Sequence, residues 1–258
     1  HDKDTRIHDV FSIDNPGTRD IDDAISMEIT GNAITLGIHI TDVAHTLLSQ
    51  LNNPDDIIEF ARRRSSSTYT DLENTTMLPP KLTYDVLSLS TNKIRKTISL
   101  WLEYVDGKMV RFRFESAYVK NVAAMQYSQF IHKFPCEYEA LSALSSQSNP
   151  HDIVAWTMMT YNKLFAHSND HILLRNKSKD VFAEYSPAHL KLKHDDIGAL
   201  YTHATSPIRR FADLYNQIIW HGYDTAGELD IDELNKASIN IKRFQYKHAV
   251  LDLSYSCR

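Results

Sequence analysis

Apolar and polar positions alternate with a period of two along much of the first part of the chain, a pattern typical of β-strands. Residues 10–13 form a short apolar strand. Residues 24–29 and 34–40 flank Gly31-Asn32, a pair that favours tight turns, so we expect a hairpin there. Segment 14–23 is therefore expected to run from the end of one strand to the entry of the next.

A second hairpin is predicted around Asp106-Gly107, another turn-forming pair. Strands are expected to dominate residues 98–122, as they do residues 8–45. The strand after this turn alternates arginines with apolar side chains, so we expect the arginines to face the solvent. The side chains expected to face the core are Val110, Phe112 and Phe114.

Helical spacing takes over elsewhere in the chain. Asn53-Pro54 is a clear helix start, and Ser206 followed by Pro207 combines a favoured N-cap residue with proline in the first helical position. The apolar residues expected on the buried face of that later helix are Ile208, Phe211, Ala212, Tyr215, Ile218 and Ile219. The helices are expected near residues 54–64, 152–168, 206–222 and 230–254.

The separation of a strand-rich half from a helix-rich half predicts a single α+β domain rather than repeated βαβ units. With 42% apolar and 24% charged residues, the composition is ordinary for a soluble globular protein. Membrane spans and a signal peptide are excluded by the pattern, and the two cysteines, Cys136 and Cys257, cannot form a disulfide framework. We therefore expect an intracellular, cytoplasmic protein; because it begins at His1, we expect it to be an excerpt of a longer chain.

Aspartates are concentrated between the first two predicted strands. Carboxylates this close repel one another unless a cation neutralises them, and oxygen ligands of this kind suit Mg²⁺ or Mn²⁺. The chemistry that fits is metal-assisted attack on a phosphodiester. Two alternatives stay open, a solvated acidic turn and the D-x-D-D string of proton-donating terpene cyclases. The four residues of this acidic cluster are Asp14, Asp20, Asp22 and Asp23.

The formal net charge is −5, but basic residues gather in local clusters, so a groove with basic walls and an acidic end could bind RNA. Arg209 and Arg210 would lie in the first turn of a helix, where the dipole disfavours cations unless an anion is present. Contact with phosphate is favoured for Arg209 and evenly balanced for Arg210. The alternative is pairing with acidic residues, including those of the acidic cluster.

Several motifs together resemble the RNB-type exoribonucleases, the family of ribonuclease II, ribonuclease R and the catalytic subunit of the eukaryotic exosome. The matching segments occur in the order of the family. They are residues 11–14 with 20–24 (the aspartate signature), 37–45 (GIHITDVAH), 64–69 with 77–79 (R-x-x-S-x-Y and M-L-P), and 205–213 (TSPIRRFAD).

The resemblance implies an RNB-like domain spanning residues 1–258, in which a mixed, mostly antiparallel sheet is flanked by helices around an RNA channel. It implies a hydrolytic 3′→5′ exoribonuclease that degrades single-stranded RNA to nucleoside 5′-monophosphates. Two Mg²⁺ ions, which Mn²⁺ may replace, would carry out the chemistry. Family members also carry flanking OB-fold domains, which 258 residues leave no room for. A larger RNA-processing complex is the other expected partner, and no membrane is expected.

The resemblance also assigns residues to roles. All four aspartates of the acidic cluster are implied to be metal ligands, with Asp22 also essential to the chemistry. Arg209 matches the arginine at the scissile phosphate, Tyr69 matches the aromatic residue that stacks on the terminal nucleotides, and Arg210 is expected to contact RNA.

Some positions depart from the family pattern. Ala155 and Trp156 stand where the family has two acidic residues, and Val250 replaces a glutamate. A long helical stretch of the family is almost absent between residues 175 and 183. These departures favour an alternative, a catalytically weakened RNB-like module that binds RNA or acts as a scaffold.

Overall fold

The computed structural model describes residues 6–70, 74–178, 182–223 and 229–242. Its long strands close into a five-stranded barrel in the order β1-β2-β3-β6-β7. Neighbouring strands are antiparallel except β1 and β7, which are parallel, so the sheet is mixed and mostly antiparallel as predicted. The strands are β1 (Ile7–Asp14), β2 (Asp23–Thr30), β3 (Ala33–Thr41), β6 (Ile94–Val105) and β7 (Lys108–Gln126).

Both predicted hairpins are present in the barrel. Thr30 pairs with Ala33 across the first turn, and Asp106 and Gly107 both have positive φ in the second, as a type I′ turn requires. The predicted orientation after the second turn is wrong for Val110 and Phe112, which are exposed. The reason is that β1 pairs with β7 only from Tyr118 onward, so the first half of β7 has a single neighbouring strand and little cover.

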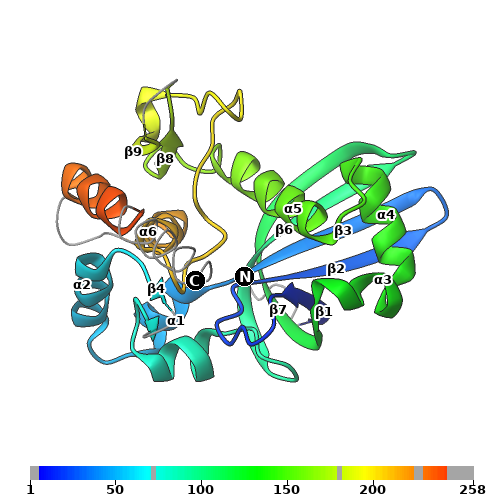
Figure 1. Ribbon diagram of the computed structural model, residues 1–258, viewed down its shortest axis with the longest axis horizontal. Helices are drawn as coiled ribbons and strands as arrows, with labels where there is room; N and C mark the ends of the chain where they lie inside the picture. Colours follow the sequence, from blue (N-terminus) through cyan, green and yellow to red (C-terminus); the bar gives the residue numbers. More distant parts are fainter. Residues whose placement is uncertain (1–5, 71–73, 179–181, 224–228, 243–258) are drawn as a thin grey trace, which may run out of the picture.

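One group of helices packs against the barrel, and a second group lies beside it (Figure 1). Those predicted at residues 54–64 and 152–168 are present, and the one predicted at 230–254 is helical over 231–242, beyond which it lies outside the described residues. The first, third and fourth helices were not predicted. The helices are α1 (Val43–Gln50), α2 (Pro54–Arg64), α3 (Tyr127–Lys133), α4 (Pro135–Ser145), α5 (Pro150–Phe165) and α6 (Phe211–Trp220).

Short elements complete the described part of the chain. They are the paired strands β4 (Thr68–Tyr69) and β5 (Asn74–Thr75), the paired strands β8 (Leu173–Asn176) and β9 (Glu184–Pro187), the π-helix η1 (Leu82–Leu87) and the 3₁₀ turn η2 (Ala188–Leu190). No helix in the described ranges is long and apolar enough to cross a membrane.

The predicted helix start at Ser206 is wrong, because α6 begins at Phe211 with Arg210 as its N-cap residue. Backbone bonds to a distant segment explain the difference. The Ser67 N–H donates to the Arg209 carbonyl at 2.9 Å, and the Phe211 N–H donates to the Ser65 carbonyl at 2.8 Å. These bonds hold the chain in an extended bridge just where a local N-cap signal favours a helix.

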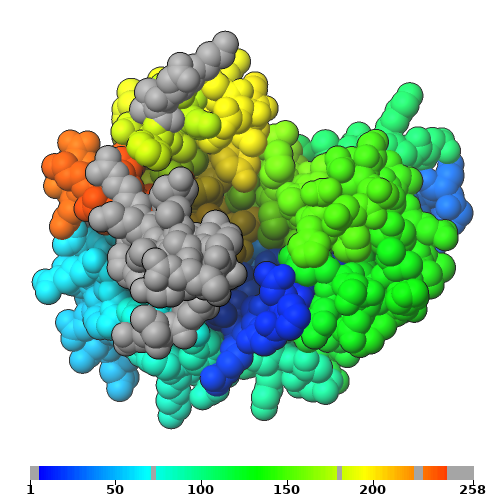
Figure 2. All heavy atoms as spheres, in the orientation of Figure 1, coloured from blue at the N-terminus to red at the C-terminus, as the bar shows by residue number. Residues whose placement is uncertain are grey.

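Two large clusters of buried side chains form the core. One fills the barrel and packs against α3, α4 and α5, and the other joins α1, α2 and α6. In the space-filling view the first described residues (dark blue) lie between the helices on the left (cyan and orange) and the part on the right (green) that includes α3, α4 and α5 (Figure 2). The segment that carries the aspartates therefore lies where the two cores meet.

Candidate functional site

The acidic cluster lies at one end of the barrel. Asp14 is the last residue of β1 and Asp23 the first of β2, and the loop between these neighbouring strands carries Asp20 and Asp22. All four line a cavity of about 600 Å³, which we call the acidic cavity. Other residues that line it are Arg19, Tyr69, Tyr84, Tyr127, His151 and Arg209.

Asp22 is the most enclosed of the four carboxylates, with 4% of its surface exposed. Its Oδ1 accepts a hydrogen bond from the Ile208 N–H at 2.9 Å, and its Oδ2 accepts one from Arg209 Nε at 3.2 Å. Burial raises the pKa of Asp22 to about 7, although Arg209 and the Ile208 N–H both act to lower it. The carboxylate is thus placed by contacts from a segment far along the chain.

The strand-end carboxylates repel one another. Burial, reinforced by the charges of Asp14 and Asp22, raises the pKa of Asp23 to about 8. Burial also raises the pKa of Asp14 to about 6, with Asp20 adding to the shift and a hydrogen bond from Ser12 opposing it. Positive charge in this cavity is therefore too small to keep all the carboxylates ionised at neutral pH.

A divalent cation fits this donor set. Asp14 Oδ2 is buried and has no hydrogen-bond partner, which leaves a hard oxygen atom available as a ligand. A bound cation would also offset the mutual repulsion that, after burial, raises the three pKa values. Within the described ranges, however, no three His, Cys, Asp or Glu side chains are already grouped as a metal site. The chemistry of the donors supports the predicted Mg²⁺, and the side chains would have to converge around it.

Tyr69 faces the acidic cavity from β4. Its hydroxyl donates a hydrogen bond to Asp20 Oδ2, and 41% of its surface is exposed. Burial of the hydroxyl and the neighbouring Asp20 raise the pKa of Tyr69 above its ordinary value, so it remains protonated. An aromatic face thus lies beside the carboxylates with its hydroxyl already engaged.

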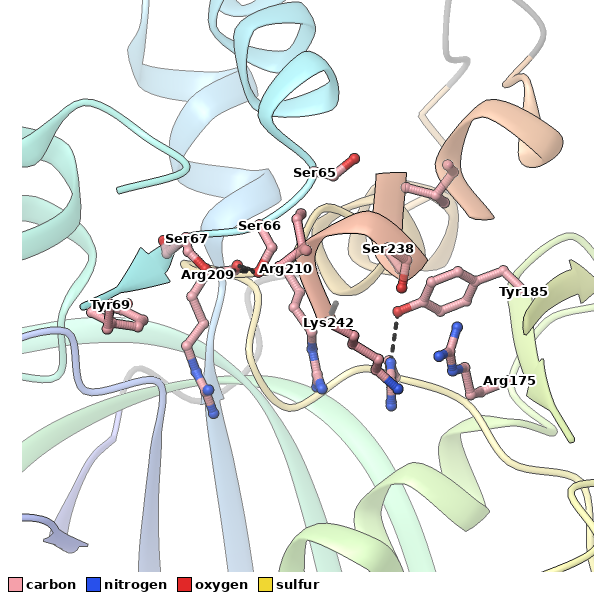
Figure 3. A pocket seen from close by; sticks show the side chains of 14 residues that line it. Ser65, Ser66, Ser67, Tyr69, Arg175, Tyr185, Arg209, Arg210, Ser238 and Lys242 are labelled. Carbon is pink, nitrogen blue, oxygen red and sulfur yellow. Dashed lines mark hydrogen bonds between the residues drawn. The ribbon is translucent and has the colours of Figure 1, made fainter. Parts of the chain in front are cut away.

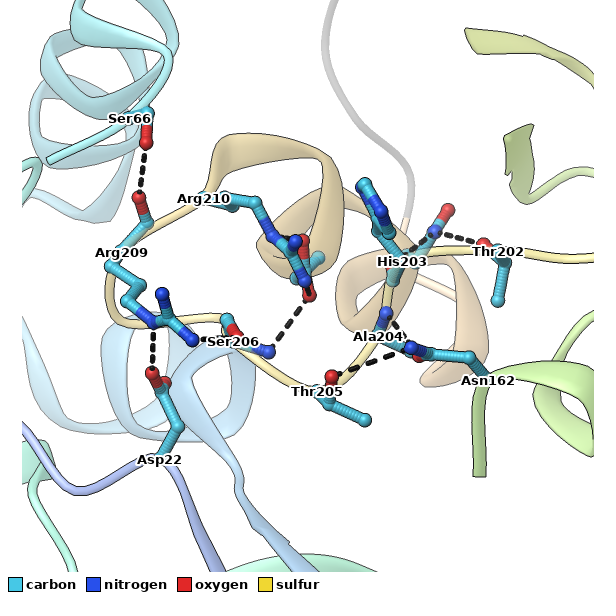
Figure 4. A network of polar contacts seen from close by, with 12 residues as sticks. Asp22, Ser66, Asn162, Thr202, His203, Ala204, Thr205, Ser206, Arg209 and Arg210 are labelled. Atoms are coloured by element: carbon cyan, nitrogen blue, oxygen red, sulfur yellow. Dashed lines mark hydrogen bonds and ion pairs between the residues drawn. The ribbon is translucent and has the colours of Figure 1, made fainter. Parts of the chain in front are cut away.

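The two adjacent arginines occupy different surroundings (Figure 4). Arg209 donates from Nε to Asp22 and from Nη2 to Ser206 Oγ at 2.9 Å, and it is half exposed. Arg210 donates to both carboxylate oxygens of the fully buried Asp213, at 2.8 and 2.9 Å. Both arginines therefore pair with carboxylates, as the alternative interpretation of the sequence allowed. Of the two, Arg209 alone lines the acidic cavity.

The sequence analysis did not identify Tyr127 and His151, whose rings stack in the cavity wall. Their centroids are 3.7 Å apart, and their planes differ by 12°. Each lies at the start of a helix. His151 is exposed, so the pattern of apolar residues does not single it out. Only the fold brings the two helix starts together at the end of the barrel.

The departures from the family pattern in α5 have unequal consequences. Ala155 lines the acidic cavity, whereas Trp156 packs against the barrel core. One of the two positions where the resemblance implies a carboxylate therefore lies in the wall of the candidate site itself. The other position lies in the packing beneath that wall.

The RNB domain model matches residues 2–135, just over half of the chain. The chain belongs to the RNB family. It is 34% identical over 120 residues to the exosome complex exonuclease RRP44 homolog A of Arabidopsis thaliana, in a match that spans 46% of this chain and 12% of that protein. It is 33% identical over 129 residues to ribonuclease R of Thermotoga maritima, in a match that spans 49% of this chain and 18% of that protein.

Solved structures share the fold over nearly the whole chain. Mycoplasma genitalium RNase R in complex with ribose-methylated single-stranded RNA has a TM-score of 0.79 at 16% identity, covering 94% of this chain and 57% of that one. Yeast Ssd1, described as a pseudonuclease, has a TM-score of 0.71 at 16% identity, covering 93% and 42%. The resemblance and the α+β fold class predicted from the sequence are confirmed, and this RNB chain corresponds to only part of each of these proteins.

Proposed function

We propose that this RNB chain is the catalytic domain, over residues 1–258, of a hydrolytic 3′→5′ exoribonuclease. It would act inside the cell on single-stranded RNA and release nucleoside 5′-monophosphates. The observation that carries the proposal is the convergence of four aspartates, Arg209 and Tyr69 on one cavity at the end of the barrel. Flanking OB-fold domains or a larger RNA-processing complex would supply further RNA contacts.

The four aspartates of the acidic cluster would hold two Mg²⁺ ions, for which Mn²⁺ can substitute. The chemistry that such ions supply is activation of water and stabilisation of the leaving oxygen. Arg209, held in place by Asp22 and Ser206, would contact the phosphate at the scissile bond. Tyr69 would stack on a terminal base while its hydroxyl holds Asp20.

Arg210 has a different role in this proposal. Its guanidinium is held by Asp213, so two of its nitrogen atoms are already committed. Contact with RNA would be made by the remaining Nη1, and the main effect of the residue would be to hold the segment that presents Arg209.

A second candidate function is a catalytically weakened RNB module that binds RNA or acts as a scaffold. Ala155 favours it, because it lines the cavity at a position where the resemblance implies a carboxylate, and yeast Ssd1 is a pseudonuclease with the same fold. The four aspartates favour the enzyme, because buried carboxylates that also repel one another are costly to keep without a cation.

Degradation of a 5′-labelled single-stranded RNA tests the proposal. With Mg²⁺ we expect the full chain to shorten the RNA from its 3′ end to a small 5′ fragment, and EDTA to stop it. Asp22→Asn should lower the rate by more than about a hundredfold, since it removes a group that acts on the reacting atoms. The matched control is Asp9→Asn, an exposed aspartate of β1 outside the cavity, which should leave the rate unchanged.

The alternative, a module that binds RNA without degrading it, predicts a different result on the gel. RNA that stays intact with the unaltered chain but shifts on a native gel would refute the nuclease and favour the RNA-binding module. RNA that Asp22→Asn degrades at the normal rate would show that the acidic cavity is not the site.

A further inference from the structure

A second cavity, of about 320 Å³, adjoins the acidic cavity on the side of β8, β9 and the helix at 231–242 (Figure 3). Tyr69 and Arg209 line both cavities and therefore form the wall between them. We call this second space the basic cavity. Its charged side chains are Arg175, Arg209, Arg210 and Lys242.

No carboxylate lines the basic cavity within the described ranges. Arg209 and Arg210 have carboxylate partners behind them, but the described residues provide no ion pair to Arg175 or Lys242. Figure 3 shows the four basic side chains reaching toward the same space from three different segments. Four cations around a small cavity favour an anionic ligand.

Arg175 is the strongest sign that the cavity is built for such a ligand. Only 3% of the residue is exposed, its guanidinium lies 4.4 Å from the Tyr185 ring centroid, and its Nη1 is buried without a hydrogen-bond partner. A buried donor on a charged group is costly unless an acceptor satisfies it. An anion in the basic cavity would provide that acceptor.

The neighbouring titratable groups agree with this geometry. Partial burial lowers the pKa of Lys242, and the charges of Arg175 and Arg210 lower it further. Burial and the same arginines lower the pKa of His203, whose Nδ1 lies 2.7 Å from the Tyr185 hydroxyl. Burial lowers the pKa of Arg175, and the charges of two carboxylates, Glu184 and Asp213, act to raise it. Asp213 is already bound by Arg210, and Glu184 is exposed.

We propose that the basic cavity binds the phosphate of a nucleoside 5′-monophosphate, and so holds the product after it leaves the acidic cavity. This inference rests on the proposed function. Guanidinium forks match a phosphate, and a phosphomonoester carries more charge than the diesters of an RNA strand. The volume lies at the lower end of the range for small-ligand pockets, about 300–1,000 Å³, which suits a single nucleotide.

The shared wall gives the product a route between the two cavities. Arg209 lines the acidic cavity together with the carboxylates, and it lines the basic cavity together with Arg210. A phosphate released beside Arg209 therefore remains within reach of a cation as it moves. Lys242 and Arg175 lie further along the same cavity and would hold it there.

Calorimetric titration of adenosine 5′-monophosphate into the full chain tests the proposal, in EDTA so that hydrolysis and metal binding play no part. We expect the monophosphate and inorganic phosphate to bind and adenosine not to bind. Loss of one charge-assisted contact in Arg175→Gln or Lys242→Gln should weaken binding about tenfold. Lys236→Gln, an exposed lysine on the same helix outside the cavity, is the matched control and should not change it.

The outcomes separate this proposal from the proposed function. If RNA is degraded but the monophosphate does not bind, or binds equally to Arg175→Gln and Lys242→Gln, the product site is wrong and the nuclease stands. If the monophosphate binds as expected but RNA is not degraded, the phosphate site stands and its role in product release is refuted. If only intact RNA binds and the two variants weaken it, the cavity holds the strand, which also overturns the proposal. Lys242 is exposed, so its variant decides the test if Arg175→Gln does not fold.

Discussion

His39 illustrates at the scale of single residues how closely the barrel interior is packed. The ring is fully buried, with Nε2 2.8 Å from Ser26 Oγ and Nδ1 2.8 Å from Ser99 Oγ. Gly37 is required beside it, because a Cβ atom there would lie 2.5 Å from His39 Nε2 and from Ser26 Oγ. The buried ring of His39 therefore requires serine at the two positions that bond it and glycine at the position beside it.

Burial of His39 predicts a loss of stability in mild acid. Burial, with a smaller effect of His8, lowers the pKa of His39 to about 3 from the ordinary 6.5. The contribution of the neutral His39 ring to the free energy of unfolding is therefore fully present above about pH 6.5, and it is lost as the pH falls toward 3. Between pH 7 and pH 5 the expected loss is about 2 kcal/mol of unfolding free energy.

Urea unfolding at the two pH values measures this loss. His39→Gln, which does not titrate, should lose about 2 kcal/mol less between them than the unaltered chain does. His203 is buried and neutral in both proteins, so its contribution cancels in the comparison. An equal loss in both would show that His39 does not titrate on unfolding.

Single residues also show what the sequence could and could not reveal about the site. The four aspartates were identifiable because they lie within ten residues of one another and because their density needs a chemical reason. Arg175, by contrast, is one arginine within an apolar strand, and its unsatisfied nitrogen exists only after β8, β9 and α6 have packed. The carboxylate partners of Arg209 and Arg210 were foreseen only as an alternative to phosphate.

At the scale of elements, α6 is fastened to its neighbours through polar side chains on its buried face. Gln217 Oε1 accepts hydrogen bonds from the Val43 and Ala44 N–H groups at 3.0 and 3.2 Å, and its Nε2 donates to the Thr41 carbonyl at 2.8 Å. The first N–H groups of α1, which no helix can satisfy internally, are thus bonded by another helix. One side chain joins β3, α1 and α6.

Loss of the Gln217 amide should be strongly destabilising. Gln217→Leu leaves two buried N–H groups and one carbonyl unsatisfied, and we expect a loss of about 2–4 kcal/mol in unfolding free energy. Gln50→Leu, at the exposed end of α1, is the control and should change it by less than about 0.5 kcal/mol. Chemical denaturation of the two variants measures both; similar values would argue against this role for Gln217.

Elements that depend on local signals were predicted well, and those that depend on distant partners were not. The start of α2 at Pro54 and both hairpin turns follow from the residues at those positions. No helix begins at the N-cap signal of Ser206, because backbone hydrogen bonds to Ser65 and Ser67, which lie far away in sequence, keep the chain extended there. The parallel pairing that closes the barrel joins β1 to β7, and no local pattern encodes it.

The whole molecule places its acidic cavity between the barrel core and the helical core. Asp22 follows the barrel strand β1 in the chain, yet its hydrogen bonds come from Ile208 and Arg209, next to α6. A ligand that changes the charge of this carboxylate therefore acts on the contact between the two cores.

A divalent cation should accordingly stabilise the folded chain as a whole. We expect saturating Mn²⁺ to raise the melting temperature by several degrees, since about 1 kcal/mol corresponds to about 2–4 °C for a domain of this size. The rise should shrink from pH 8 to pH 6, because protons then compete for the carboxylates whose pKa values are raised to about 6, 7 and 8.

Two variants make this measurement specific. Asp14→Asn removes a predicted ligand and should abolish most of the rise, whereas Asp9→Asn, outside the cavity, should keep it. Scanning calorimetry with and without EDTA gives both values. An equal rise in the two variants would place the cation elsewhere.

Closure of the barrel by its first and last strands has a consequence for biosynthesis. Asp14 is fixed only when β7 pairs with β1, so it has no defined position until the ribosome has released residue 126. Arg209 emerges more than eighty residues later. A nascent chain thus carries its aspartates long before it holds the arginine that lines the same cavity, so the acidic cavity is complete only late in synthesis.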